Sequence, residues 1–598
     1  MNLQTYYYFL LLRRAYQDVE NYVHLPISMT TIAQTLFCTE RNVKLILNKL
    51  IEEGLIEFTS GRGRGNTSTI TFLESLNSSL LKQIKILIKE NEVNKALDLV
   101  KEFGKSTEVE EYVINWITNY FGYKKIPYSE NELEILRFPI YRPITTVDPC
   151  QVFFDFDAHL VKQVYNTLVD YHKDTREFTG SLAHSWENNE DCTEWVFFLR
   201  KGVQFHNGKE LTANVVKNSI ERLRHSPHKW LMDDILEIKV LSKYAISFSL
   251  NKANHLFLHY LAYTPMSIID TAHSHEGFFE FPFGTGPFQF EKIESASCVI
   301  QANPNYFGYR PHLDKIEIIQ IPEELKDSIK GLNKIFLDTG ETKRDEKEKW
   351  DTTSVSFSGT NVITFNTVKD GPLKNVKIRK ILGQLFDRKK LAGLGKPRLQ
   401  PADGFLIDQE QAEFVTAPNP PLSVIKEKLK SFGYLGEKIT LYTYTRHSLD
   451  GKVIQRMLAE AGVRLELKIV GWNKIQCSDV LSSADMIMFE GTPNEGFISL
   501  FELLLFEKGF IFPLLTEPLR NKMLGFIGQI RGEINSKQRL KLYRDLEKFL
   551  VDNGIITFLV HKQVEVSYDV SLEGVHFNSR KWIDFKDLWY KHFRISSN

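Results

Sequence analysis

The apolar positions of the first 73 residues follow two helical repeats before the pattern changes. Within 30–37 and within 39–53 they recur every three or four residues, which predicts two amphipathic helices with a turn at Cys38. Thr39 is a residue type that caps helix N-termini, and Gly54 is the type that accepts a positive φ after a helix C-terminus. The spacing therefore predicts a helix-turn-helix whose second helix buries Val43, Ile46, Leu47 and Leu50.

Two short extended segments, 55–59 and 69–72, then predict a β-hairpin whose loop at 61–66 reads Gly-Arg-Gly-Arg-Gly-Asn. A basic, glycine-rich loop is typical of the wing of a winged helix, where arginines pair with phosphates or enter the minor groove. Winged helices also serve as protein-interaction modules, so the fold alone does not establish DNA binding. For duplex DNA, the contact residues expected on the exposed face and the wing are Thr39, Arg41, Asn42, Lys44, Asn48, Arg62, Arg64 and Asn66.

Residues 75–121 carry a third pattern, which is helical with breaks at Asn91 and Gly104. Apolar residues repeat at helical spacing on each side of the breaks, which predicts two or three helices rather than one long coiled coil. Such a segment can connect two modules, pack on one of them, or form the face of a homodimer. The sequence leaves these three roles open.

From Asp148 onward the pattern mixes helices and strands. An apolar helical stretch is followed by a hairpin, 183–186 with 195–199, and Thr212 is placed to cap a further helix. Much later, a strand, a helix and a strand predict a βαβ-like unit at 439–444, 448–461 and 463–470. The chain after the N-terminal region is therefore expected to be of the α/β class.

Composition narrows the function classes. A chain of 598 residues is long enough for three or four domains, and its 75 Lys and Arg balance 75 Asp and Glu. This neutrality excludes a globally basic nucleic-acid coat, so any DNA contact depends on a local patch. Five scattered cysteines without Cys-x-x-Cys spacing, no export signal and no apolar run of membrane length predict reduced thiols in a cytoplasmic protein without a membrane partner.

Ordered motifs of the mixed region resemble the solute-binding proteins of peptide and nickel ABC transporters. The matching stretches include Leu182-Ala183-His184-Ser185-Trp186, Arg200-Lys201-Gly202-Val203-Gln204-Phe205-His206-Asn207-Gly208 and Gly284-Thr285-Gly286-Pro287-Phe288. The resemblance implies a two-lobed periplasmic-binding-protein-like domain that binds a small solute between its lobes.

The N-terminal region, through 36–43 and 61–65, resembles SgrR-type transcriptional regulators, in which a DNA-binding domain is fused to a cytoplasmic solute-binding domain. The two resemblances together imply an α/β multidomain protein, an N-terminal winged helix-turn-helix plus a two-lobed periplasmic-binding-protein-like domain of the peptide/nickel-binding class. We expect the winged helix at 1–73, a helical connector at 74–129, the first lobe at 130–345, the second lobe at 346–555 and a return to the first lobe at 556–598.

The resemblance also implies a ligand site at the cleft. Peptide-binding members carry a Trp-x-x-Asp-Tyr-x-Asp-Pro segment in the second lobe, whereas 485–494 of this chain keeps only Glu490 as a group for a ligand ammonium. A neutral or anionic ligand is equally consistent, and SgrR-type regulators are associated with sugar-phosphate stress. Trp472 either stacks on a ligand or lies in the core. The residues expected to line the cleft are Thr285, Gly286, Asn366, Trp472 and Glu490.

Catalytic motifs are missing from the sequence. It has no Gly-x-Ser-x-Gly, no Walker loop and no His-Glu-x-x-His, and the histidine pairs at 255/259, 273/275 and 225/228 lack the further ligands of a metal site. We expect no catalytic residue, metal or cofactor, and two partners, operator DNA and a small molecule. The alternative is a transport-type solute-binding protein for peptide, sugar or nickel with an accessory interaction module.

Overall fold

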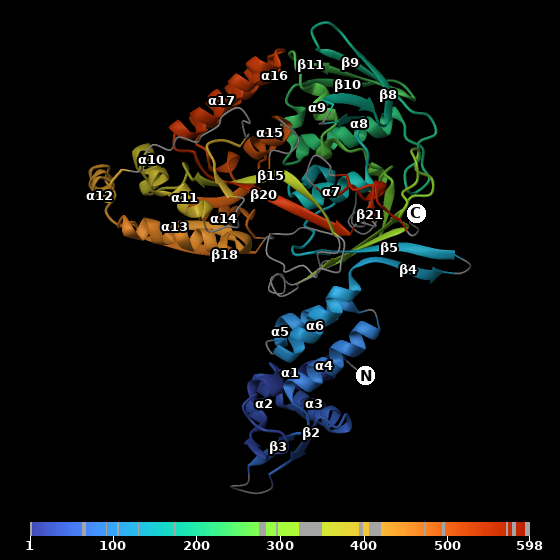
Figure 1. Cartoon of the computed structure of the whole chain (residues 1–598), viewed down its shortest axis with the longest axis vertical. Coiled ribbons are helices and arrows are strands. Elements are labelled where there is room, and N and C mark those ends of the chain that lie inside the picture. The colour runs from blue at the N-terminus through green and yellow to red at the C-terminus, as the bar shows by residue number, and fades with distance from the viewer. Residues whose placement is uncertain are drawn as a thin grey trace, which may run out of the picture. The chain divides into compact units, whose positions relative to one another are not determined.

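The protein is described here from a computed structural model (Figure 1). By contact density the chain divides into two compact units. The first holds Met1–Gly122, Arg137–Arg142 and a segment beginning at Ile318, and the second holds the remainder. The structure describes residues 3–591 except 62–66, 91, 105–106, 129–130, 173–174, 274–282, 295–296, 322–349, 394–398, 406–419, 472–473, 493–496, 570–571 and 577–581.

The first unit contains the predicted winged helix. Its elements are α1 (Leu3–Ala15), β1 (Leu25–Ile27), α2 (Met29–Thr35), α3 (Glu40–Glu52), β2 (Ile56–Thr59) and β3 (Ser68–Phe72). The strands form an antiparallel sheet in the order β1-β3-β2. Ile32, Val43 and Leu50 are fully buried, as the helical spacing predicts, whereas α1 was not predicted from the sequence.

Both ends of α3 are closed by the predicted residues. The Thr39 hydroxyl accepts a hydrogen bond from the Asn42 amide at 3.4 Å. Gly54 has a φ of 67°, and the Leu55 amide donates to the Leu50 carbonyl at 3.0 Å. This arrangement satisfies a carbonyl that the last turn of the helix leaves open, and it requires left-handed backbone at Gly54.

Three further helices form residues 75–121, and they bear on one of the roles that the sequence left open. α4, α5 and α6 share one hydrophobic core with the winged helix. Arg13, buried near the end of α1, donates to the Glu74 carbonyl at 3.1 Å and so ties α1 to the start of α4. The segment therefore packs on the winged helix. Its helices span Leu76–Lys89, Val93–Phe103 and Thr107–Tyr120.

The first lobe follows, and it belongs to the second unit except for Gly122 and residues 137–142 and 318–320, which contact density assigns to the first unit. Its elements are β4 (Gly122–Tyr128), β5 (Asn131–Ile140), α7 (Asp155–Val164), β6 (Val169–His172), β7 (Glu177–Gly180), β8 (Ala183–Asn188), β9 (Glu194–Leu199), α8 (Ala213–Glu221), β10 (Ile235–Ser242), β11 (Ala245–Leu250), α9 (Phe257–Leu261), β12 (Phe288–Ile293), β13 (Ser297–Ala302) and β14 (Lys315–Gln320). The main sheets run in the orders β10-β11-β9-β8 and β12-β13-β14-β5-β4. The predicted hairpin is β8 with β9. Thr212 is at the N-cap of α8, but its side chain makes no capping hydrogen bond.

His206 joins two motifs of this lobe that are far apart in the sequence, 200–208 and 284–288. Its ring lies between Gly284 and Gly286, where Nδ1 accepts from the Gly284 amide and Nε2 donates to the Gly286 carbonyl, each at 3.2 Å. These roles need a neutral ring, and burial lowers the pKa of His206 to about 4. A Cβ on Gly286 would lie 2.4 Å from the Val164 carbonyl carbon, so this close approach requires glycine.

The second lobe is built on a six-stranded sheet in the order β16-β20-β15-β19-β17-β18. The predicted βαβ unit is β17, α13 and β18, with the two strands parallel. The elements from here to the C-terminus are β15 (Trp350–Phe365), α10 (Val376–Leu385), α11 (Arg388–Ala392), β16 (Leu399–Pro401), α12 (Leu422–Ser431), β17 (Ile439–Tyr444), α13 (Ser448–Glu460), β18 (Leu465–Val470), α14 (Ser478–Ser483), β19 (Met486–Gly491), α15 (Phe497–Leu505), α16 (Glu517–Gly532), α17 (Ser536–Asp552), β20 (Ile556–Asp569), β21 (Leu572–Glu573) and β22 (Trp589–Tyr590).

The return to the first lobe begins later than the predicted residue 556. β20 pairs antiparallel with β15 from Thr364 opposite Ile556 to Trp350 opposite Asp569, so it belongs to the second lobe's sheet. Figure 1 shows the two strands running side by side through the larger unit. The apolar pattern of β20 marks it as a strand without naming its partner, which explains the difference.

Replacing Gly54 with alanine should destabilise the N-terminal unit by about 1 kcal/mol, because an L-residue in left-handed backbone costs about that much. No neighbour lies within 4 Å of an added Cβ, so backbone strain is the only cost. Gly54→Asn is the control, since asparagine tolerates this conformation better. We expect the denaturant midpoint to fall for Gly54→Ala and to stay closer to wild type for Gly54→Asn. Equal losses in both variants would contradict this explanation.

Candidate functional site

The outer face of α3 carries the residues predicted to contact DNA. Arg41, Asn42, Lys44 and Asn48 are all exposed, and Thr39 caps the helix just before them. Their exposure follows from the burial of the opposite side of α3 in the core of the unit. The predicted wing residues Arg62, Arg64 and Asn66 lie outside the described part of the chain.

Thr285 and Gly286, two of the predicted cleft residues, lie against the end of α7. The Thr285 hydroxyl is buried and donates to the Asn166 side-chain oxygen at 3.0 Å. The Gly286 amide donates to the Val164 carbonyl at 2.9 Å, and its carbonyl accepts from the Asn303 side chain at 3.0 Å. The structure thus gives both residues a packing role inside the first lobe, and their contact with a ligand stays a prediction.

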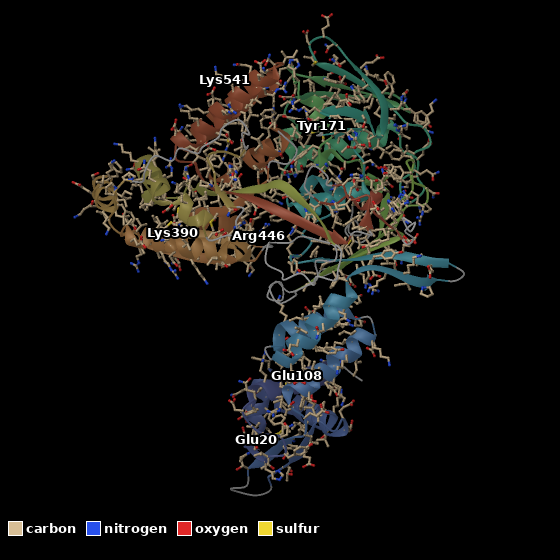
Figure 2. The ribbon with its side chains drawn as sticks, in the orientation of Figure 1. Glu20, Glu108, Tyr171, Lys390, Arg446 and Lys541 are labelled. Carbon is tan, nitrogen blue, oxygen red and sulfur yellow. The ribbon has the colours of Figure 1, made fainter. Side chains whose placement is uncertain are left out.

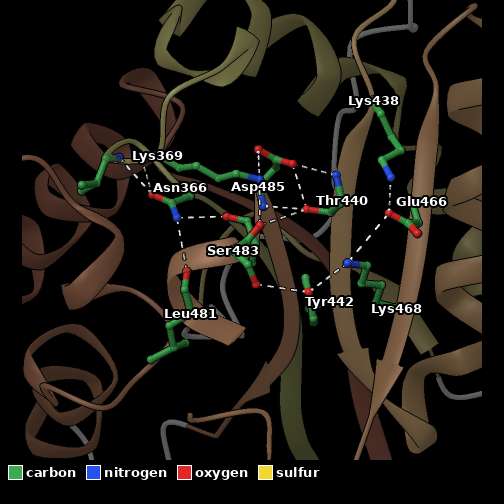
Figure 3. A network of polar contacts seen from close by, with 12 residues as sticks. Asn366, Lys369, Lys438, Thr440, Tyr442, Glu466, Lys468, Leu481, Ser483 and Asp485 are labelled. Atoms are coloured by element: carbon green, nitrogen blue, oxygen red, sulfur yellow. Dashed lines mark hydrogen bonds and ion pairs between the residues drawn. The ribbon is translucent and has the colours of Figure 1, made fainter. Parts of the chain in front are cut away.

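Asn366 lies in a polar network at the end of β15 (Figure 3). Its side-chain amide donates to the carbonyls of Leu481 at 3.3 Å and Ala484 at 2.9 Å, and its oxygen accepts from the backbone amides of Val368 and Lys369, each at 3.0 Å. These bonds fill the hydrogen-bonding capacity of the amide group. Asn366 therefore fastens α14 to β15, and a ligand contact at this residue also stays a prediction.

Glu490, on β19, lies at the centre of a buried ion cluster. Its carboxylate is 3.2 Å from the Lys562 ammonium on β20 and 3.5 Å from the Arg446 guanidinium, which follows β17. The side chains of Glu490, Lys562 and Arg446 are 6%, 16% and 41% exposed, so the cluster meets solvent on the Arg446 side. Figure 2 labels Arg446 on the second lobe.

The ionisation state of Glu490 depends on its burial and on the two neighbouring cations. Burial acts to raise the pKa of Glu490, but Arg446 and Lys562 outweigh it and lower the pKa to about 2. Glu490 is therefore ionised and already paired at neutral pH. A ligand ammonium, the partner suggested by the sequence, would have to compete with two cations for this carboxylate.

Neutral polar groups hold the cluster in place. The Glu490 amide donates to the Tyr444 hydroxyl at 3.3 Å, and His447 Nε2 lies 3.0 Å from the same hydroxyl. Burial lowers the pKa of His447 to about 4, so the ring is neutral near pH 7. Asn361, directly opposite Glu490 in the sheet, donates to the Asp450 carboxylate at 3.2 Å. The cluster and the polar groups around it thus come from five segments: β15, β17 with the turn after it, α13, β19 and β20.

The two lobes meet next to this cluster. The Thr492 hydroxyl, just beyond β19, donates to the Asp155 carboxylate at the start of α7, at 2.8 Å. α7 belongs to the first lobe and β19 to the second, so this hydrogen bond joins the lobes two residues from Glu490. The cluster therefore lies next to a contact between the lobes, and the contact of Glu490 with a ligand stays a prediction.

Sequence reasoning missed Arg446 and Lys562. Arg446 lies two residues after β17, at the carboxyl end of the parallel strands of the predicted βαβ unit. Because α/β folds bind ligands at that end of their strands, the sequence did contain an indication of its role. Lys562 reaches Glu490 only because β20 and β19 both flank β15, which no local pattern indicates. Trp472 lies outside the described residues.

Among the residues that the structure describes, no group of three or more His, Cys, Asp or Glu is arranged to hold a metal ion. In the same part of the chain, no helix combines the length and apolar character needed to cross a membrane.

The fold consists of a winged helix followed by two lobes, with a buried polar cluster next to the contact between the lobes. These features define a class of protein in which a solute-binding domain is fused to a helix-turn-helix module. Sequence comparison agrees with this description. Residues 177–496 match the bacterial extracellular solute-binding proteins, family 5 (middle region), and residues 3–120 match the N-terminal region of sugar transport-related sRNA regulators. The chain belongs to the family 5 solute-binding proteins, in the SgrR-type arrangement with that N-terminal domain.

Individual relatives extend over almost the whole chain. The uncharacterized protein YhjP of Bacillus subtilis is 29% identical over 571 residues, covering 94% of this chain and 95% of YhjP. The HTH-type transcriptional regulator SgrR of Photorhabdus laumondii is 25% identical, with 95% of each chain covered. Among solved structures, DppA of Helicobacter pylori in complex with the peptide STSA has a TM-score of 0.66 at 20% identity, covering 76% of this chain and 98% of DppA. The last match supports the fold alone.

Replacing Glu490 with glutamine should destabilise the protein at pH 7 by about 3 kcal/mol, because two cations would lose their buried counter-charge. The folded-state pKa of Glu490 is depressed from 4.5 to about 2, so its ionised form stabilises the fold above pH 4.5 and this contribution is lost as the pH falls toward 2. Thermal unfolding of variant and wild type should therefore converge over that interval.

The control for this substitution is Glu466→Gln on β18 of the same lobe. Glu466 pairs with Lys438 at 2.9 Å, but both side chains are exposed, so the loss should be small. Similar losses at positions 490 and 466 would contradict a special role for the buried cluster.

Proposed function

We propose that the protein is a ligand-responsive transcriptional regulator, which binds duplex DNA through its winged helix and a small solute in the interlobe cleft. The observation that carries this proposal is the cationic outer face of α3 on the same chain as a two-lobed solute-binding fold. The HTH-type transcriptional regulator SgrR, aligned over nearly the full length, supports the same function.

The outer face of α3 suits a nucleic-acid partner better than a protein partner. Arg41, Lys44 and Lys49 are exposed within three helical turns, and the Glu40 carboxylate is engaged by the Thr30 hydroxyl at 2.6 Å. The acidic residues of α3, Glu40 and Glu52, lie at its two ends, so Arg41, Lys44 and Lys49 form a cationic stretch between them on the exposed face. An operator sequence in duplex DNA is therefore the proposed partner of this face.

The proposed ligand site is the junction of Glu490, Arg446 and the Asp155–Thr492 contact. A solute held there touches both lobes, which is the requirement for a ligand to stabilise the closed form. Because Glu490 is already paired, the exposed Arg446 is the group best placed to meet the ligand, which favours an anionic or hydroxyl-rich solute over an ammonium. A sugar-phosphate-related compound fits this description.

The remaining parts of the proposal concern what the protein does not do. We propose ligand sensing without catalysis, and action in the cytoplasm, where a DNA-binding module meets its target. A homodimer is proposed only as the state in which paired operator half-sites would be read. The transport-type alternative, a solute carrier with an accessory interaction module, leaves the cationic face of α3 without a use.

The route of the signal is proposed to run through α4–α6. These helices share a core with the winged helix, and Ile319 and Ile321 contribute to the same core. Ile319 is in β14, a strand of the first lobe's five-stranded sheet.

The wing tests DNA binding. Changing Arg62 and Arg64 together to alanine should weaken binding to all duplexes and reduce the slope of log affinity against log salt by up to about two, since each arginine accounts for about one phosphate contact. Lys89→Ala with Lys95→Ala is the control, because it removes the same charge from α4 and α5. Unchanged affinity and slope in the wing variant would argue against the proposed contact.

Calorimetry tests the coupling between the two sites. A solute identified by thermal-shift screening should bind about 5- to 150-fold more tightly or more weakly when operator DNA is present, and DNA affinity should change by the same factor in the presence of the solute. Reciprocity follows because both ligands act on one equilibrium between open and closed states. Identical solute affinities with and without DNA would mean that the two domains share a chain without sharing a signal.

A further inference from the structure

One apolar side chain interrupts the polar outer face of α3. Leu45 is 59% exposed and does not belong to the hydrophobic core of the unit. The residues two positions before and after it, Val43 and Leu47, are buried, and successive residues turn by about 100° around a helix. Leu45 therefore lies on the side of α3 opposite the core, at the centre of the surface proposed to enter DNA.

The neighbours of Leu45 on that surface are polar and cationic. Arg41 is four residues before it and Asn48 three residues after it, so the three side chains form one stripe along the helix. Lys44 and Lys49 lie on either side of the stripe and are exposed as well. An isolated exposed leucine is ordinary on a protein surface, but this one lies between two side chains of the types that read bases.

We infer that Leu45 reads the C5 methyl group of thymine in the major groove, so that α3 selects sites with thymine between the bases contacted by Arg41 and Asn48. This inference rests on the proposed DNA binding and deepens it. Thymine is the only base that presents a methyl group in the major groove, and it is read by apolar side chains. The polar ends of arginine and asparagine side chains cannot make that contact, whereas the branched apolar end of leucine can.

The basic character of the surface argues for DNA as the occupant rather than a second copy of this chain. A homodimer through α3 would bring Arg41, Lys44 and Lys49 against their own copies, which repel at close range. Duplex DNA places phosphates along both edges of the groove, which matches a stripe flanked by cations. Charge complementarity thus selects the occupant.

The test uses the full-length chain and a random-sequence duplex library. Selection at moderate salt should return duplexes with a shared thymine, and replacing that thymine by uracil removes only the methyl group. Wild-type protein should lose about fourfold in affinity on this replacement, the value of one buried methyl group. Leu45→Ala should bind the thymine and uracil duplexes equally, since it lacks the contact.

Ile51→Ala is the matched control. Ile51 is also an exposed aliphatic residue on α3, 42% exposed, but it lies away from the stripe near the end of the helix. This variant should keep the wild-type sensitivity to uracil. Leu45 is largely exposed, so its replacement should leave the unfolding temperature unchanged, and the uracil series on wild-type protein tests the inference without any variant.

The outcomes separate this inference from the proposed function. The thymine contact is overturned, and DNA binding left intact, by either of two results. In the first, duplexes are retained but uracil has no effect at any thymine. In the second, wild type and Leu45→Ala are equally sensitive to uracil. Failure to retain any duplex at low salt would overturn both. A Leu45→Ala variant that loses a dimer in sedimentation but keeps its uracil sensitivity would assign Leu45 to an interface between copies, against this inference.

Discussion

The antiparallel pairing of β15 with β20 is the constraint on which the second lobe depends. These strands lie far apart in the sequence, and all residues between them must fold as an insertion bounded by their ladder. The pairing places Asn361 of β15 between Glu490 of β19 and Val560 of β20. Lys562 is thereby brought to Glu490 across the sheet. The ion cluster is a consequence of this strand order, because its members share no local sequence pattern.

A buried ion cluster is also one way in which the chemistry of a site can change while the architecture of the fold stays the same. A buried carboxylate is stable only when its charge is compensated, and Arg446 and Lys562 supply that compensation from within the protein. The same carboxylate without these partners would be available to a cation of the ligand. The fold shared with DppA is therefore compatible with a different solute, since fold similarity does not transfer the chemistry of a cleft.

In the N-terminal unit, one structural feature likewise has two consequences. Burial of one side of α3 both holds the winged helix together and leaves Arg41, Lys44, Leu45 and Asn48 on the outside. α4–α6 extend that core instead of forming a separate linker, and Ile319 and Ile321 take part in it.

The amino-acid sequence by itself determined the features that depend on neighbours along the chain. Helical spacing predicted α2 and α3, Thr39 and Gly54 predicted the ends of α3, and alternation predicted the β8–β9 hairpin and the β17–α13–β18 unit. Only the tertiary structure decided that Thr285 and Asn366 are engaged by their own lobe, that Glu490 is paired with Arg446 and Lys562, and that β20 remains in the second lobe. The physical reason is that local periodicity records which side of an element is buried, whereas strand partners and ion pairs depend on contacts between residues that no sequence spacing relates.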